Sequence, residues 1–311
     1  MRHIMSRSQP TDGFNPKPGF AEMIAPGIRR ILAPNPSPMT YRGTNTYLIG
    51  TRNLAVIDPG PGSEPHLEAI LSSLNAGQSI DAILVTHSHL DHSPLAKRLQ
   101  EETGAAIYAF GPAGAGRSAI METLAQEDVT GGGEGIDHAF SCDHVLKDGE
   151  TLSGPDWQIE ALHTPGHLGN HLCFALGDIL FSGDHVMGWA SSLVSPPDGD
   201  LTDFMASCRK LQDRQWSRFL PGHGAPIDAP HARLDWLIAH RLERERAILA
   251  ELRIAPRTVS ELAATIYKET PAALLKAAER NVFAHLVDLT QRNIAQPEGA
   301  LSLSTRFSCT D

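Results

Sequence analysis

Several features that the sequence lacks exclude whole classes of protein. The chain of 311 residues has four scattered cysteines, and no two of them form a Cys-x-x-Cys pair. This usage is typical of reduced thiols and argues against a secreted, disulfide-linked protein. No apolar run reaches about 18 residues, and residues 1–19 contain no apolar stretch that could serve as a secretory signal. We therefore expect a cytoplasmic protein that does not enter a membrane.

An excess of positive charge is also missing. The formal net charge is −10. Residues 1–235 carry 16 Lys and Arg against 27 Asp and Glu, whereas residues 236–311 carry ten against nine. An acidic surface repels phosphate backbones and gives no counterion-release drive. The charge therefore counts against strong nucleic-acid binding, although it does not exclude a local basic groove.

The most informative segment that is present covers residues 86–92 and reads Thr-His-Ser-His-Leu-Asp-His. It follows directly on an apolar run, so we expect a strand to deliver its side chains to one edge of a sheet. In an extended chain His87 and His89 share one face, and Asp91 and His92 fall where a helix is predicted to begin. Neutral imidazole and ionised carboxylate are the ligands that a cation such as Zn²⁺ binds.

Three later segments each end a short apolar run in a further candidate ligand beside a glycine. They read Thr-Pro-Gly-His, ending at His167, Phe-Ser-Gly-Asp, ending at Asp184, and Pro-Gly-His-Gly, which contains His223. Glycine lets the backbone turn sharply and approach a metal closely. We expect these strand ends to converge on the segment 86–92 and to form one metal site.

The order of these motifs resembles the metallo-β-lactamase superfamily of hydrolases. The upstream segment Val-Ile-Asp-Pro-Gly, with Asp58, resembles that superfamily's first motif, and Asp58 could orient a ligand histidine. Residues 35–48, together with His171 four residues after His167, resemble the narrower beta-lactamase-like-protein-2 group. That resemblance implies two activities, because the group includes single-strand-selective endoribonucleases and its fungal relatives include thioesterases acting on carrier-bound polyketides.

The resemblance also implies a catalytic centre with two divalent metal ions. Asp184 would bridge them together with a hydroxide, which shared coordination makes available at neutral pH. Zinc suits the histidine-rich donors, and iron or manganese fits the same set. Asp91 and Asp184 are thus predicted to be catalytic, and His171 either donates to the substrate or only hydrogen-bonds within the site. One metal would take His87, His89 and His167, and the other would take Asp91, His92 and His223.

Alternating strands and helices predict an α/β fold with two domains. Residues 1–231 are expected to form two sheets faced by helices, which is the αββα sandwich of the metallo-β-lactamase superfamily. Residues 232–311 resemble a small winged-helix domain. Its predicted parts are a helix at 232–252, a capping box at 258–261 that opens a second helix, a third helix from Thr270-Pro271 to about Asn293, and a hairpin within 294–307.

Two functions follow from the sequence. The acidic body favours a binuclear metal-dependent hydrolase of a carbonyl ester, thioester or lactone, with a small-molecule or carrier-bound substrate. The alternative is a single-strand-selective endoribonuclease, in which Lys276, Arg280 and Arg292 of the third helix would contact RNA. In the first case the tail packs against the catalytic domain and walls one side of the cleft. The sequence leaves the oligomeric state open.

Overall fold

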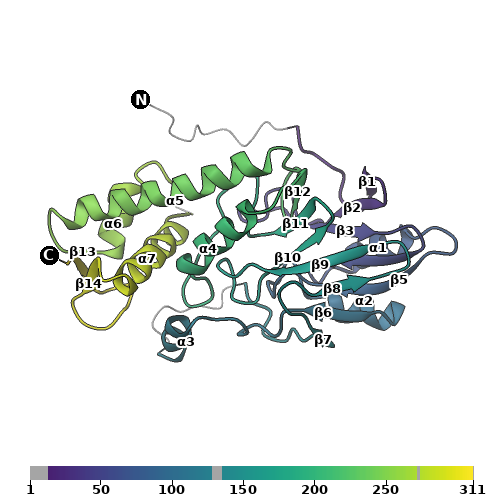
Figure 1. Ribbon diagram of the computed structural model, residues 1–311, viewed down its shortest axis with the longest axis horizontal. Helices are drawn as coiled ribbons and strands as arrows, with labels where there is room; N and C mark the ends of the chain where they lie inside the picture. The colour runs from purple at the N-terminus through teal and green to yellow at the C-terminus, as the bar shows by residue number, and fades with distance from the viewer. Residues whose placement is uncertain (1–12, 128–134, 272–273, 311) are drawn as a thin grey trace.

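The computed structural model of the chain describes residues 13–127, 135–271 and 274–310. Two sheets pack face to face with helices on their outer sides, and a third sheet of three short strands lies in the C-terminal region (Figure 1). The predicted α/β class and αββα sandwich are confirmed. Among the described residues, no helix combines the length and apolar character needed to cross a membrane.

The first sheet places the carboxyl ends of neighbouring strands at the same edge. Its first four strands pair antiparallel and the last four pair parallel. Parallel neighbours need a crossover, and α1 (Glu64–Ser72) and α2 (Leu95–Thr103) supply two of them. In spatial order the strands are β1 (Ala21–Ala25), β2 (Ile28–Leu32), β3 (Asn45–Ile49), β4 (Asn53–Ile57), β5 (Ser79–Leu84), β6 (Ala106–Ala109) and β7 (His144–Val145).

The second sheet has five strands and one parallel pair. In spatial order they are β12 (Arg218–Pro221), β11 (Ile179–Gly183), β10 (Leu172–Leu176), β9 (Gln158–His163) and β8 (Thr151–Ser153). β11 and β12 run parallel, with α4 (Leu201–Gln212) between them in the chain, and the other pairs are antiparallel. The ends of β11 and β12 therefore also share one edge.

Strict alternation along the strands decides which side chains fill each layer. Tyr47 of β3 packs between the sheets with Phe174 of β10 and Phe181 of β11. Leu48, the next residue along β3, faces the other way and packs in the layer that contains α1 and α2. Cys173 of β10 likewise packs in the layer that contains α4. The core of the sandwich is thus built in three layers.

The C-terminal region contains the predicted helices and hairpin. Its elements are α5 (Pro230–Leu252), β13 (Arg257–Thr258), α6 (Val259–Ile266), α7 (Leu275–Gln291), β14 (Ala295–Pro297) and β15 (Arg306–Cys309). The predicted capping box is confirmed, because Thr258 Oγ1 accepts from the Glu261 N–H at 3.3 Å and Glu261 Oε2 accepts from the Thr258 N–H at 2.8 Å. β14 and β15 pair antiparallel, which confirms the hairpin.

Helix α5 takes part in two hydrophobic cores. Leu234 and Leu237 near its start pack against the second sheet and α4. Ile248 and Leu252 near its end pack in the C-terminal core, together with Met121 of α3 (Ala119–Gln126). Figure 1 shows α5 running along both parts. The predicted domain boundary after residue 231 falls in the first turn of this helix, and the division into two domains stays a prediction.

The third helix of the tail begins later than the sequence predicted. The expected start was Thr270-Pro271, whereas α7 begins at Leu275 and has Leu274 as its N-cap residue, with no side-chain cap. Residues 272–273 lie outside the described part of the chain. The Leu274 N–H donates to the Pro271 carbonyl at 2.8 Å, a bond between residues three apart and not the four of an α-helix.

We expect the free energy of unfolding to fall as the pH drops from about 6.5 to 4, in part because of His66. This side chain is buried, its Nε2 lies 2.8 Å from Thr46 Oγ1, and burial lowers the pKa of His66 to about 4. Histidine in the unfolded chain has a pKa of about 6.5, so the unfolded state takes up this proton first. The stability that neutral His66 contributes is therefore complete above about pH 6.5 and is lost as the pH falls toward 4.

Urea unfolding of the wild type and of His66→Gln at several pH values measures this effect. Glutamine keeps a donor for Thr46 but does not titrate. The stability advantage of the wild type over the variant should shrink by at most about 1.4 kcal/mol per pH unit on acidification. If the free energies of unfolding of the wild type and the variant differ by the same amount from about pH 7 to about pH 4, titration of His66 does not contribute to stability.

Candidate metal centre

The two sheets bring four strand ends to one edge of the sandwich. β5 leads into the segment 86–92, and β9 leads into the loop that carries His167. Asp184 directly follows β11, and His223 follows β12 after one glycine. The seven side chains that the sequence predicted as ligands lie together there in overlapping groups. Their binding of metal stays a prediction, which the geometry of their atoms supports.

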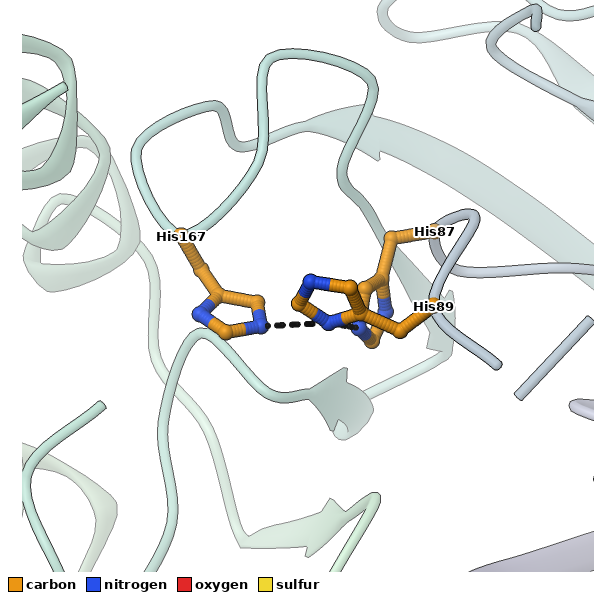
Figure 2. Close-up of side chains that lie close together, drawn as sticks. All are labelled: His87, His89 and His167. Carbon is orange, nitrogen blue, oxygen red and sulfur yellow. Dashed lines mark hydrogen bonds between the residues drawn. The ribbon is translucent and has the colours of Figure 1, made fainter. Parts of the chain in front are cut away.

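The first group consists of three imidazoles that face one another. His87 Nε2 lies 2.9 Å from His89 Nδ1, and His167 Nε2 lies 3.1 Å from the same atom. Figure 2 shows the three rings turned toward a common point, with His167 on one side and His87 and His89 on the other. Three nitrogen atoms this close together can serve as ligands of one cation.

The second group adds a carboxylate to two imidazoles. His223 Nε2 lies 3.1 Å from Asp91 Oδ2 and 3.3 Å from His92 Nε2. His92 Nε2 lies 3.6 Å from Asp91 Oδ2. Both histidines are buried, whereas Asp91 is partly exposed, so this group borders the solvent through the carboxylate.

Asp184 lies between the two groups. Its Oδ2 is 3.8 Å from His167 Nε2 in the first group and 3.3 Å from His223 Nε2 in the second. Its Oδ1 is 3.5 Å from His92 Nε2 and has no hydrogen-bond partner among the described residues, although it is buried. A buried carboxylate oxygen without a partner is costly, and a cation would satisfy it. The carboxylate is therefore placed where it can contact two cations.

Backbone carbonyls fix the tautomers of two ligand histidines. His167 Nδ1 lies 2.7 Å from the Leu193 carbonyl, and His223 Nδ1 lies 3.1 Å from the Gly43 carbonyl. A carbonyl only accepts, so in each ring Nδ1 carries a proton and Nε2 is the nitrogen left to face the site. This is the arrangement that metal-binding histidines need.

Asp58 orients the other two buried histidines. His92 Nδ1 lies 2.8 Å from Asp58 Oδ2, so that contact orients His92 directly. The Thr86 hydroxyl donates to Asp58 Oδ2 at 2.8 Å, and His87 Nδ1 lies 2.9 Å from that hydroxyl. Because the hydroxyl proton is used, His87 donates to it and keeps its Nε2 lone pair free. The geometry matches the predicted orienting role of Asp58.

The charges around the site also suit a cation. Burial lowers the pKa of His89 to about 3, so this ring is neutral at pH 7. Burial would also lower the pKa of His92, but the carboxylates of Asp91 and Asp184 outweigh it and raise that pKa to about 9. Carboxylates that attract a proton attract a divalent cation more strongly, and metal binding then displaces the proton. The donor set therefore fits divalent metal ions.

His171 uses both ring nitrogens inside the protein. Its Nε2 accepts from the Asp184 N–H at 3.2 Å, and its Nδ1 lies 3.0 Å from Thr164 Oγ1, whose hydroxyl donates to Cys173 Sγ. The side chain is fully buried. Burial is also the main cause that lowers the pKa of His171 well below its usual range. These contacts favour the second predicted role, in which His171 hydrogen-bonds within the site, over donation to a substrate.

Three partners of the ligand histidines were not found from the sequence. Gly43 and Leu193 act through backbone carbonyls, which every residue has, so no residue type marks them. The Thr86 hydroxyl could have been identified, because it directly precedes His87 at the end of a predicted strand.

The sandwich and its cluster of histidines and aspartates place the protein in the class of metal-binding hydrolases. Residues 39–223 match the family model described as "Metallo-beta-lactamase superfamily", and residues 258–301 match the "Beta-lactamase associated winged helix domain". The chain belongs to the metallo-beta-lactamase superfamily and carries the associated winged helix domain. The sequence prediction of a hydrolase of this superfamily is confirmed.

Named relatives and solved structures agree with this assignment. The chain is 31% identical to a "Beta-lactamase-like protein 2 homolog" of Drosophila melanogaster, over 90% of this chain and 91% of the relative. It is 31% identical to an "Atrochrysone carboxyl ACP thioesterase" of Claviceps purpurea, over 80% of this chain and 74% of the relative. A crystal structure of a metallo-beta-lactamase family protein from Thermus thermophilus aligns with a TM-score of 0.74 at 25% identity, covering 93% of this chain and 100% of that one.

A beta-lactamase domain protein from Burkholderia ambifaria shares the fold as well. Its structure aligns with a TM-score of 0.79 at 21% identity, over 97% of each chain. The likeness therefore extends over the sandwich and the C-terminal region together.

Proposed function

We propose that the protein is a binuclear metal-dependent hydrolase of a carbonyl ester, thioester or lactone. The observation that carries the proposal is the position of Asp184 between two groups of donors, 3.8 Å from His167 Nε2 and 3.3 Å from His223 Nε2. Zinc is the favoured metal, and iron or manganese suits the same donors. The first ion would be held by His87, His89 and His167, the second by Asp91, His92 and His223, and Asp184 would contact both.

The chemistry divides between the metals and the chain. Two bound cations would supply an activated water at neutral pH and would stabilise negative charge on the reacting oxygen. The chain's own residues hold the ligands in place beforehand, since Asp58 orients His92 and the Leu193 carbonyl orients His167. Ligands fixed in advance need no rearrangement during the reaction.

The packing of α7 favours a small or carrier-bound substrate over RNA. Residues 282–289 of this helix are buried one after another, so neighbouring elements cover this part of the helix on all sides, whereas Leu275 and Lys276 in its first turn are exposed. A helical segment buried on every face cannot enter a nucleic-acid groove. Figure 1 shows α7 beside α4 of the catalytic part. The tail is therefore better suited to supporting the catalytic part.

Two of the three basic residues predicted to contact RNA form ion pairs or hydrogen bonds with other side chains of the protein. Arg292 is accessible to solvent, but it forms ion pairs with Glu245 at 3.0 Å and with Asp288 at 3.4 Å. Arg280 Nη1 donates to Ser195 Oγ at 3.2 Å. The third residue, Lys276, is exposed. Together with the net charge of −10, this leaves little positive surface for a phosphate backbone.

The similarity to a protein named as a carrier-protein thioesterase makes a thioester the first substrate class to test. Purified protein reconstituted with Zn²⁺, Fe²⁺ or Mn²⁺ would be assayed on acyl thioesters, p-nitrophenyl esters, lactones, bis-p-nitrophenyl phosphate and single-stranded RNA. We expect the highest kcat/KM on one of the carbonyl substrates. Faster cleavage of RNA than of all carbonyl substrates would overturn this ranking.

The alternative function is the single-strand-selective endoribonuclease, which the winged helix domain favours. We expect weak RNA binding by the metal-loaded Asp184→Asn protein, with little further change in Lys276→Ala or in the triple variant that also carries Arg280→Ala and Arg292→Ala. A salt titration measures it, because phosphate contacts make affinity fall steeply with salt. Tight, salt-sensitive binding that the triple variant loses while keeping its fold would favour the ribonuclease.

We expect His223→Ala to lower the metal content from two ions per chain to one. Among the candidate ligands, His223 lies against Asp91, His92 and Asp184, so the three imidazoles of the first group should keep their geometry. Elemental analysis after reconstitution at neutral pH gives the count. His144→Ala, which removes an exposed histidine, is the matched control. A wild type with one ion or fewer, or a variant with two, would refute the binuclear assignment.

A further inference from the structure

A short stretch of chain lies between the metal centre and the C-terminal helices. We call residues 192–195 the support segment. On its inner side Ser192 Oγ donates to the carbonyl of Asp184 at 2.5 Å and lies 2.9 Å from the carbonyl of His185. Ser192 is fully buried. The backbone that carries the shared carboxylate is thus attached to this segment.

The next residue of the support segment holds a second ligand. The Leu193 carbonyl accepts from His167 Nδ1 at 2.7 Å, which leaves the Nε2 lone pair directed at His89 Nδ1, 3.1 Å away. A displacement of this carbonyl would turn the imidazole or release its tautomer. The support segment therefore sets the position of one ligand of the first group and the backbone of the ligand that both groups share.

On its outer side the support segment is held by two helices of the tail. Arg241 of α5 donates through Nη2 to the Ser192 carbonyl at 2.5 Å and through Nη1 to Asn281 Oδ1 of α7 at 2.8 Å. Asn281 Oδ1 also accepts from the Val194 N–H at 3.3 Å. The two side chains thus hold successive peptide groups of the segment.

The burial of Arg241 is costly, which points to a specific role. Only 2% of its surface is exposed, and burial lowers the pKa of the guanidinium. A buried charge persists where its hydrogen bonds are needed, since an apolar residue would fill the same space at lower cost. Here those hydrogen bonds go to a backbone carbonyl of the support segment and to the amide that holds the same segment.

We propose that Arg241 and Asn281 are positioning residues, through which the C-terminal helices fix the support segment and, with it, two ligands of the metal centre. The inference rests on the proposed metal centre and gives the tail a role in its assembly. Asp58 and the Gly43 carbonyl orient His92 and His223 independently of the support segment. The effect should therefore fall mainly on the site of His87, His89 and His167.

The test measures Zn²⁺ affinity by competition with a chelator, together with the absorption spectrum of the Co²⁺-loaded protein. For Arg241→Met we expect one of the two Zn²⁺ affinities to weaken about 10–100-fold, as is typical when a partner of a metal ligand is lost, and the other, which shares only Asp184 with the support segment, to weaken less. The Co²⁺ spectrum should change as well. The matched control is Arg246→Met on the same helix, since Arg246 is exposed and contacts the carbonyl of Leu242 in its own helix.

A second pair of variants separates positioning from packing. Asn281→Leu removes the oxygen that accepts from Arg241 and Val194, and should weaken the same Zn²⁺ site. Asn281→Asp keeps an oxygen there and should restore the affinity. If Arg241→Met does not fold, Asn281→Leu tests the outer contacts of the support segment, and Ser192→Ala tests its inner contacts with the carbonyls of Asp184 and His185.

Metal affinity is measured without substrate, so a wrong substrate class would not affect the outcome. If the folded Arg241→Met and Asn281→Leu proteins bind Zn²⁺ as the wild type does and are only less stable in urea without metal, the residues are packing residues and the inference is wrong. A wild type that binds no Zn²⁺ would overturn both the inference and the metal centre.

Discussion

Replacement of Asp184 by Asn should lower the turnover of the metal-reconstituted enzyme at least about a hundredfold. Asparagine has nearly the same size but lacks the negative charge that two cations would share. Burial would raise the pKa of Asp184, but His223 and His92 outweigh it and hold that pKa well below its usual range, so the native group is ionised. The amide would also direct a neutral group at ring nitrogens such as His92 Nε2, which lies 3.5 Å from Oδ1.

Steady-state kinetics on the best carbonyl substrate, with metal content measured on the same sample, checks this expectation. The matched control is Asp178→Asn, because Asp178 is exposed in the turn just before β11 and Asp184 directly follows that strand. The control should keep normal turnover and normal metal content. An Asp184→Asn protein with full metal content and near-normal turnover would show that this carboxylate is not part of the catalytic centre.

Removal of metal by a chelator at neutral pH should abolish hydrolysis and lower the melting temperature. Without a cation, the buried Asp184 Oδ1 has no hydrogen-bond partner among the described residues. The imidazoles of His87, His89 and His167 then face one another with no ion between them. A ligand that binds only the folded state at about a thousand times its Kd adds about 4 kcal/mol of stability. Metal removal should cost stability of that order per tightly bound ion.

Thermal unfolding and activity would be followed through removal of metal and its return. Zn²⁺, Fe²⁺ and Mn²⁺, added back one at a time, should restore the melting temperature and the activity to different extents. The metal that restores the most activity is the working metal. A protein freed of metal, as verified by elemental analysis, that still turns over substrate would refute a metal-dependent mechanism. Recovery of the melting temperature without recovery of activity would indicate a structural metal only.

The candidate ligands could be predicted from the sequence because the chemistry restricts residue type and neighbours. Imidazoles and carboxylates that follow apolar strands and lie beside glycine can be recognised in the amino-acid sequence. The structure brings His87, Asp184 and His223 together from distant segments. The capping box at Thr258 was predictable for a similar reason, since it depends on two side chains three residues apart. The start of α7 was placed too early, because Leu274 bonds to Pro271 three residues back and the α-helix begins only at Leu275.

The sequence by itself determined the α/β class, the set of candidate ligands and the local helix signals, because each depends on residue type and short spacing. Only the tertiary structure decided how those ligands are held. The Leu193 and Gly43 carbonyls that fix His167 and His223 carry no signal in residue type. The position of Arg241 against the support segment depends on the packing of α5 on the second sheet and α4. Contacts between distant segments are set by how whole elements pack, and no local pattern records them.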